Sequence, residues 1–241
     1  MAERTSLIKF INIEKSFRNV TILKNLSLKI YSDEIIFIIG PSGSGKSTLF
    51  KILLGFYKPD SGFIYFGNKN LVYNNNLIRS IVGFVSQENS FYERLTVEEN
   101  IIFFAKLYGV SKKELEVRLN YLLNLVKLNK YRNIIGEKLS GGMKRRLEFA
   151  ISLIHNPKIL ILDEPFTGLD IKIQDDLWKL LYEIKREGVT ILISTHILWI
   201  AERYADRVVF LHNHKIVKDL NLKDYNYNID LKKLFYEVIK E

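Results

Sequence analysis

The chain has 241 residues and 47% of them are hydrophobic, which is enough apolar material for one large domain or two small ones. It contains no cysteine, which excludes disulfides and thiolate metal sites, and no apolar run approaches the roughly 18 residues of a membrane-spanning helix. The formal net charge of +9 leaves three surfaces open: a solvated lysine-rich one, one that meets anionic lipid, and one that meets nucleic acid.

The first nine residues lack the apolar stretch of a secretory signal, so we expect a cytosolic protein. Short apolar strands separated by turns are predicted for the opening third of the chain. They cover 7–13, 23–30, 34–39, 63–66 and 81–85. The third is continuously apolar, which is typical of a parallel strand that is covered on both faces. Helical spacing follows at 48–54 and ends at Gly55.

Between that strand and that helix, residues 40–47 read Gly-Pro-Ser-Gly-Ser-Gly-Lys-Ser, which satisfies the phosphate-loop pattern. Its glycines allow successive backbone N–H groups to close on an anion, and the helix adds its positive end. Lys46 would reach the β and γ phosphates of a nucleotide, and Ser47 would hold a magnesium ion. The predicted phosphate-binding residues are Gly40, Pro41, Ser42, Gly43, Ser44, Gly45, Lys46, Ser47 and Thr48.

A helical segment is predicted in the middle of the chain. Two possible capping boxes, Thr96 with Glu99 and Ser111 with Glu114, each open a helical stretch. Strands are predicted again at 159–162, 189–194 and 208–211, and a polar stretch at 221–228 precedes a last helix at 231–241. The helical segment therefore separates two sheet-forming regions.

The strand predicted at 159–162 runs directly into two carboxylates, Asp163 and Glu164. Successive strand residues point to opposite faces, so the two acids cannot share one task. Asp163 suits the magnesium shell, and Glu164 suits the polarisation of an attacking water. Together with the phosphate loop, this pair predicts nucleotide hydrolysis.

Three further features stand at predicted element ends. Gln87 and His196 each follow a strand, and taken alone each is an ordinary surface or structural side chain. Residues 140–142 read Ser-Gly-Gly at the start of a helix that runs to Leu153, which makes a second anion site. Three cations, 144–146, oppose the macrodipole there, so either this surface meets negative charge or it is a solvated basic face.

In their order along the chain, these motifs resemble those of the ATP-binding subunits of ABC transporters. The resemblance rests on the phosphate loop, Gln87, Ser140-Gly141-Gly142, Asp163-Glu164, Thr167-Gly168-Leu169-Asp170 and His196. It implies an α/β fold: a P-loop NTPase core with a mixed sheet, a small antiparallel β subdomain and an inserted helical subdomain. The implied parts are a core with the β subdomain at 1–88 and 156–218, the helical subdomain with the signature motif at 89–155, and a short C-terminal helical tail at 219–241.

The resemblance also implies two subunits that pair head to tail, as a homodimer or with a related ATPase subunit. Each ATP would lie between the phosphate loop of one subunit and the signature of the other. The implied signature contacts are Ser140, Gly141 and Gly142, and the implied ligands of Mg²⁺ are Ser47, Gln87 and Asp163. Asp170 would lie at the subunit contact, and His196 would touch the γ phosphate as a catalytic residue beside Glu164 and Lys46. Phe17 matches the aromatic that stacks on adenine, although a plain core role stays open.

Met143 and the following basic run resemble the drug-resistance and polysaccharide-type exporters. This implies an ATPase on the inner face of the cell membrane that powers transport, with export as its direction, through a separate membrane-spanning permease. We expect Phe91, Tyr92 and Phe104 to be exposed and to be candidates for the permease contact, with core packing as the alternative for Phe104. The alternative function is a soluble ABC-type ATPase that acts on nucleic acid or ribosomes, although we expect no direct contact with nucleic acid. A non-catalytic regulatory module conflicts with the complete catalytic residues.

Overall fold

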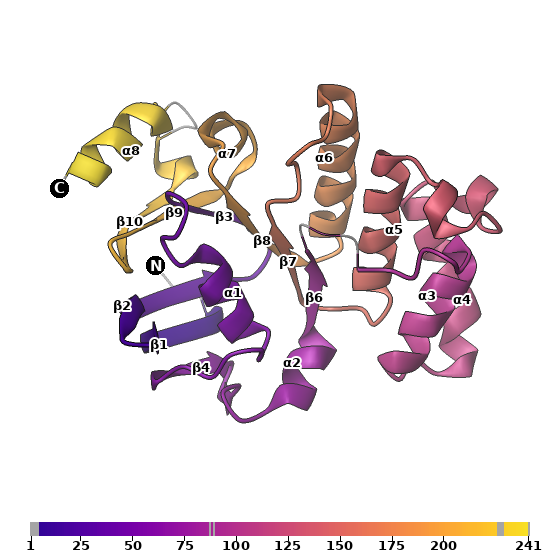
Figure 1. The fold of residues 1–241 in the computed structure, drawn as a ribbon, viewed down its shortest axis with the longest axis horizontal. Coiled ribbons are helices and arrows are strands. Elements are labelled where there is room, and N and C mark those ends of the chain that lie inside the picture. Colours follow the sequence, from indigo (N-terminus) through magenta and orange to yellow (C-terminus); the bar gives the residue numbers. More distant parts are fainter. Residues whose placement is uncertain (1–4, 87, 89, 226–228, 241) are drawn as a thin grey trace. The chain divides into compact units, whose positions relative to one another are not determined.

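The computed structural model describes residues 5–86, 88, 90–225 and 229–240, and Figure 1 shows its ribbon. By its internal contacts the chain divides into two compact units. The first consists of residues 1–78 and 190–241, and the second of residues 79–189. Each unit has strands and helices of its own, so the fold is of the α/β class, as predicted.

The first unit contains a four-stranded antiparallel sheet in the order β2-β1-β4-β5. Its strands are β1 Ser6–Phe17, β2 Val20–Tyr31, β4 Ser61–Phe66 and β5 Lys69–Asn70. In β1, Ile8, Phe10 and Ile13 are buried and their neighbours are more exposed, as expected when one face of a sheet covers a core. This is the small antiparallel sheet that the resemblance implies.

A second, mixed group of strands belongs to the same unit (Figure 1). The strands are β3 Ile35–Ile39, β8 Thr190–Thr195, β9 Arg207–His212 and β10 Lys215–Asn221. β3 pairs in parallel with both β8 and β9, and β9 pairs antiparallel with β10. Every residue of β3 and β8 is buried. Burial on both faces explains why β3 reads as a continuous apolar run in the sequence.

The helices of this unit are α1 Lys46–Leu53, α2 Asn75–Ile81, which extends into the second unit, α7 Leu198–Tyr204 and α8 Leu231–Lys240. α1 ends where the sequence predicts, because Gly55 follows it with a φ of +76°. The predicted last helix is also present. It is tied to α7, because the Leu231 amide donates to Glu202 Oε1 at 2.7 Å.

The second unit combines two parallel strands with helices (Figure 1). Its elements are β6 Val82–Val85, β7 Ile159–Asp163, α3 Val97–Leu107, α4 Lys112–Leu125, α5 Gly141–Leu153, α6 Ile171–Arg186, and two short 3₁₀ turns at Asn129–Tyr131 and Gly136–Lys138. α3, α4 and α5 pack on one another. The first capping box is complete, because Thr96 Oγ1 accepts from the Glu99 amide at 3.1 Å and the Glu99 carboxylate accepts from the Thr96 amide at 2.8 Å.

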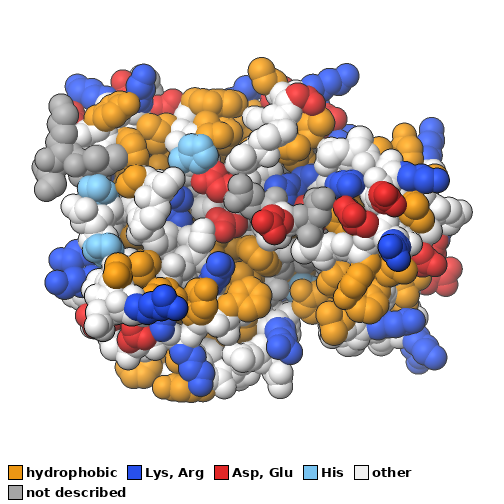
Figure 2. Space-filling view, viewed as in Figure 1, with side chains coloured by type: hydrophobic (Ala, Val, Ile, Leu, Met, Phe, Trp, Pro, Cys, Tyr) orange, Lys and Arg blue, Asp and Glu red, His pale blue; other side chains and the backbone are white. Residues whose placement is uncertain are grey.

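On the face drawn in Figure 2, Lys and Arg side chains are spread among apolar and acidic ones. On this face the positive charge therefore does not gather into a single basic patch. Along the described parts of the chain, no helix combines the length and the apolar content that crossing a bilayer requires.

His155, just after α5, makes stability depend on pH. Its ring stacks on Tyr108 with 4.0 Å between centroids, its Nε2 lies 3.1 Å from the carbonyl of Val82, and burial lowers its pKa to about 4. The unfolded chain therefore binds a proton as pH falls below about 6.5, before the folded chain does.

The stability associated with the neutral ring is fully present above about pH 6.5 and is lost as pH falls toward the folded pKa. We predict that the free energy of unfolding drops by up to about 2 kcal/mol between pH 7 and pH 5 because of this residue. Urea unfolding should show a smaller drop in His155→Phe, which keeps an aromatic stack without titrating. The same pH slope in both proteins would contradict the assignment.

Candidate functional site

The glycine-rich loop at residues 40–47 connects the carboxyl end of β3 to α1, and glycine is required for its shape. Gly43 and Gly45 have φ values of +78° and +106°, in the region that disfavours a side chain. A Cβ on Gly40 would lie 2.2 Å from the carbonyl oxygen of Leu211, so only glycine lets the loop pass the backbone of β9. The loop conformation therefore follows from its sequence.

Lys46 is folded back over this loop. Its side chain is buried, and its Nζ donates to the carbonyl of Gly40 at 2.8 Å and to that of Pro41 at 3.1 Å. This holds the ammonium group against the loop backbone. Of the remaining predicted residues, Ser42 and Ser47 are exposed, and Pro41 and Thr48 are half-buried.

The loop fits a phosphate group chemically. The hydroxyl of Ser44 is buried and has no hydrogen-bond partner within the described structure, so it is available to bond a ligand. α1 begins at Lys46, and Gly45 before it has no side chain with which to cap the first N–H groups. These amides, the Ser44 hydroxyl and the Lys46 ammonium suit the oxygens of an anion.

His196 directly follows β8, the strand next to β3. Ile39 at the end of β3 is in register with Thr195 at the end of β8, so Gly40 and His196 follow paired residues of adjacent parallel strands. His196 is exposed, and the turn that contains it is held by the Thr195 hydroxyl, which accepts from the Ile197 amide at 3.1 Å. The structure thus brings the predicted histidine to the strand end where the loop begins.

Phe17 ends β1 in the same unit. Its ring is 38% exposed, so Phe17 is not a core residue, which was the alternative considered from the sequence. The loop and the antiparallel sheet are in contact, because a Cβ on Gly45 would lie 2.7 Å from Leu23 of β2. Phe17 therefore stands at the edge of a sheet against which the loop packs.

In the second unit, Asp163 ends β7 and Glu164 follows it, and both are half-buried. Val85 is in register with Leu162, so Ser86 and Asp163 come next at the adjacent carboxyl ends of β6 and β7. Gln87 lies outside the described residues. Glu164 has a φ of +49°, a left-handed conformation that costs a side chain of this kind about 1–2 kcal/mol. Backbone strain of this kind is common at functional sites.

The Ser-Gly-Gly motif begins α5. Ser140 caps the helix, because its hydroxyl accepts from the Met143 amide at 3.3 Å. A Cβ on Gly142 would lie 3.0 Å from the side chain of Ile173, so packing against α6 favours glycine there. A Cβ on Gly141 would meet nothing within 4 Å, and its φ is not positive. The fold therefore does not require glycine at 141, and that backbone is open to a ligand.

The basic run 144–146 at the start of α5 is neither a solvated basic face nor an open surface for negative charge, the two interpretations made from the sequence. Lys144 pairs with Glu93 at 3.4 Å, and Arg146 pairs with Asp176 at 3.2 Å. Arg145 is buried, and its guanidinium donates to Glu148 at 2.8 Å and to the carbonyl of Ser86 at 2.6 Å. Burial raises the pKa of the Glu148 carboxyl, and the charge of Arg145 opposes that rise. The three cations thus serve contacts within the second unit.

Asp170 has a structural task, because it caps α6 by accepting from the Ile173 amide at 3.0 Å. The segment before it turns at Gly168, whose φ is +76°. A helix cap alone accounts for an aspartate at this position. The predicted role of Asp170 at a subunit contact remains a prediction.

The prediction that Phe91 is exposed is wrong, because its ring is 7% exposed and packs against Gly136, where a Cβ would lie 2.6 Å away. Tyr92 is 52% exposed, and Phe104 is half-buried. Their ring centroids lie 6.1 Å apart, and the exposed ring of Phe103 lies 4.8 Å from Tyr92. These three residues, 92, 103 and 104, form an aromatic cluster at the surface of the second unit.

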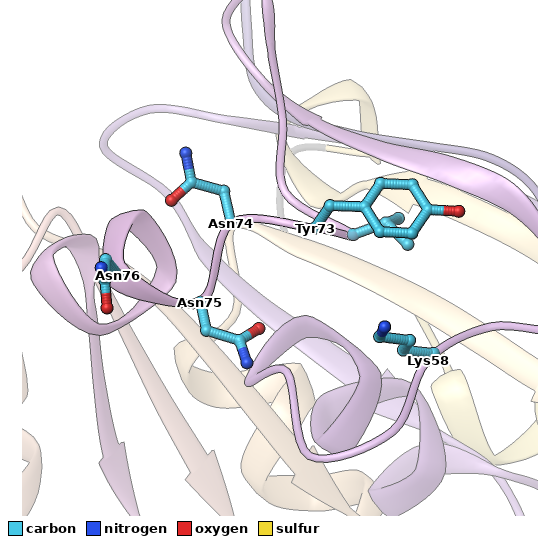
Figure 3. A pocket seen from close by; sticks show the side chains of 6 residues that line it. Lys58, Tyr73, Asn74, Asn75 and Asn76 are labelled. Carbon is cyan, nitrogen blue, oxygen red and sulfur yellow. The ribbon is translucent and has the colours of Figure 1, made fainter.

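An open depression of about 320 Å³ lies in the first unit, outside the glycine loop (Figure 3). It is lined by Lys58, Val72, Tyr73, Asn74, Asn75 and Asn76. Lys58 follows the carboxyl end of α1, whereas the glycine loop precedes its amino end. None of the predicted site residues lines this pocket, so it is separate from the candidate phosphate site.

A model of the ABC transporter family matches residues 23–167 of the chain. A Nod factor export ATP-binding protein of Sinorhizobium fredii is 37% identical over 88% of this chain and 62% of its own length. An ABC transporter ATP-binding protein of Methanocaldococcus jannaschii is 34% identical over 90% of this chain and 78% of its own length. The chain thus spans only part of the first relative and most of the second.

A solved structure with the same fold is a dimeric ATP-binding cassette in a post-hydrolysis state, bound to ADP and phosphate. It has a TM-score of 0.79 and 28% identity, and it covers 89% of this chain and 98% of its own. This likeness agrees with the α/β fold and with the predicted nucleotide.

The strain at Glu164 predicts an unusual response to substitution. Glu164→Gly should be more stable than Glu164→Ala by about 1 kcal/mol, because only glycine adopts the left-handed conformation without cost. At Glu183, an exposed position inside α6, the order should reverse by a similar amount. Urea unfolding of the four variants measures both differences. A glycine variant less stable than the alanine variant at position 164 would show that its backbone is not strained.

Proposed function

Because the chain belongs to the ABC transporter family, we propose that it is the ATP-hydrolysing subunit of a transporter whose membrane-spanning permease is a separate chain. The observation that carries this proposal is the glycine loop with its buried Ser44 hydroxyl and its folded-back Lys46. The proposed parts are the ATP-binding core with the β subdomain at 1–88 and 156–218, the helical subdomain at 89–155 and the C-terminal tail at 219–241.

The triphosphate is bound by the loop amides, the Ser44 hydroxyl and Lys46. Lys46 exchanges its bonds to the loop carbonyls for bonds to phosphate oxygens, which are charge-assisted and stronger. Phe17 offers its exposed ring to the adenine. Ser47, Gln87 and Asp163 are the residues that would hold Mg²⁺, which would offset the negative charge of the phosphates.

Glu164 orients and polarises the attacking water, and His196 touches the γ phosphate. Hydrolysis by in-line attack requires little covalent chemistry from the protein, so positioning and electrostatic stabilisation carry it. The left-handed backbone of Glu164 supports this assignment, because strain of this kind is retained where a side chain must point in one direction.

The signature Ser140, Gly141 and Gly142 serves a nucleotide bound to a second copy of this chain or to a related ATPase subunit. The open backbone of Gly141 supports this, since an approaching phosphate needs the space that a side chain would fill. The dimeric state of the solved cassette bound to ADP and phosphate supports it as well. Asp170 lies at that subunit contact.

The permease contact is the aromatic cluster of Tyr92, Phe103 and Phe104, because exposed aromatic side chains that touch one another are favoured at protein interfaces. The chain then works on the inner face of the cell membrane. Export is the proposed direction, in keeping with the Nod factor export relative. The alternative, action on nucleic acid or ribosomes, is less favoured because the cations of the 144–146 run are paired within the protein.

Magnesium-dependent ATP hydrolysis tests the enzymatic part. Glu164→Gln should lower turnover by about a hundredfold or more while ATP still binds, because the variant removes the group that polarises water. Glu183→Gln, an exposed change in the same unit, should keep wild-type turnover. The assay uses protein copurified with its membrane partner. Wild-type turnover in Glu164→Gln, or none in the wild type, would contradict the proposal.

Transport tests the permease contact. Tyr92→Asp should leave basal ATP hydrolysis intact and lower transport-linked hydrolysis by about tenfold, because it places a charge in an apolar contact. Tyr131→Asp, at a tyrosine of the same unit that is 43% exposed, is the matched control. Loss of basal and coupled activity together in Tyr92→Asp would argue against docking at the aromatic cluster.

A further inference from the structure

Residues 57–60 are the second half of the segment that joins α1 to β4, and they fold back on the helix that begins at the glycine loop. The amide of Tyr57 donates to the carbonyl of Lys51 in the last turn of α1, at 3.2 Å. Tyr57 is half-buried, and the side chain of Asp60 is 48% exposed. The segment is therefore anchored to the helix of the phosphate site by its backbone.

Asp60 fixes the end of β1, where Phe17 lies. Its carboxylate accepts from Lys15 Nζ at 2.7 Å and from the Ser16 amide at 2.6 Å, and its own amide donates to the carbonyl of Glu14 at 2.8 Å. These contacts reach the three residues that directly precede Phe17. The hydrogen bond from Lys15 also lowers the pKa of the Asp60 carboxyl, so the carboxylate stays charged near neutral pH.

Tyr57 and Lys15 then contact the Phe17 ring itself. The Tyr57 ring meets it edge to face, with 5.0 Å between centroids and 68° between planes. Lys15 Nζ lies 5.2 Å from the centroid of Phe17 and is held there by its pair with Asp60. A ring that is 38% exposed would otherwise be free to change rotamer in solvent.

We propose that Tyr57 and Asp60 are positioning residues that hold Phe17 as a fixed platform for the base of the nucleotide. The platform and the phosphate loop are then set by the same helix, α1, from its two ends. This inference rests on the proposed function, since it assumes that a nucleotide occupies the loop. Stacking reads the face of a base and not its edge, so the platform adds affinity for ATP and GTP alike.

Tyr57 and Asp60 should affect the binding of the base but not that of the phosphates. Titration calorimetry with two magnesium-loaded probes measures the two separately. The probes are ATP, which has a base, and inorganic tripolyphosphate, which has none. The proteins are the full chain as wild type, Phe17→Ala, Tyr57→Ala, Tyr57→Phe, Asp60→Ala and the double variant Phe17→Ala with Tyr57→Ala. Thermal melting of each variant confirms that it is folded.

Tyr73→Ala is the control, because Tyr73 is a tyrosine of the same unit with a similar lysine contact: Lys58 Nζ lies 5.5 Å from the Tyr73 ring centroid, and Lys51 Nζ lies 5.8 Å from that of Tyr57 (Figure 3). We expect ATP affinity to fall about tenfold in Phe17→Ala and about fivefold in Tyr57→Ala and Asp60→Ala, with tripolyphosphate affinity unchanged. Tyr57→Phe keeps the edge contact and should keep wild-type affinity. Tyr73→Ala should match the wild type with both probes.

Because Tyr57 acts through Phe17, the double variant should lose no more ATP affinity than Phe17→Ala alone. Equal losses for ATP and tripolyphosphate in Tyr57→Ala would overturn the inference, since they indicate a general effect on the fold. Additive losses in the double variant, or wild-type ATP affinity in Phe17→Ala, would also overturn it while leaving the phosphate loop assignment intact. A wild type that binds neither probe would overturn the proposed function itself.

Discussion

The parallel pairing of β3 with β8 and β9 is the constraint on which the phosphate site depends. Every residue of β3 is buried, and β3 lies between β8 and β9. The glycine loop therefore starts between two neighbouring strands. The backbone of β9 stands so close that Gly40 has no room for a side chain. The loop then passes through left-handed conformations at Gly43 and Gly45 before α1 starts, and glycine-rich turns of this kind allow successive amides to face an anion. An anion site follows from this geometry before any charged side chain is considered.

The sequence predicts the loop, the strands around it and the helix caps well, because each is a local pattern that the fold does not override. Thr96 and Glu99 lie three residues apart, and their capping box needs no distant partner. β10 escapes prediction because it is an edge strand in which Leu220 is the buried residue, so it lacks an apolar alternation. α6 is also not among the predicted helices, but it has a readable signal: Leu177, Leu181 and Ile184 are apolar at helical spacing, and all three are buried.

Side-chain environments that depend on distant residues were harder to predict. The cations at 144–146 oppose the dipole of α5 locally, but Lys144 finds Glu93 about fifty residues earlier. The buried pair of Arg145 and Glu148 was within reach, since an opposite charge three residues along a helix is a readable signal. Nothing local in the sequence indicates that Gly136, about 45 residues later, makes room for the ring of Phe91. The positive φ of Glu164 has no sequence signature either, because glutamate is not a residue that favours it.

The central claim is that each chain carries two halves of different ATP sites, the glycine loop and the Ser140–Gly142 signature, so that hydrolysis needs two chains. The dependence of ATP turnover on protein concentration tests this most directly, because association follows mass action. For the chain purified without its permease, at saturating magnesium and ATP, turnover per chain should rise with concentration and level off once the chains are paired. A constant turnover per chain over about a hundredfold dilution, down to concentrations at which light scattering finds single chains, would contradict the account.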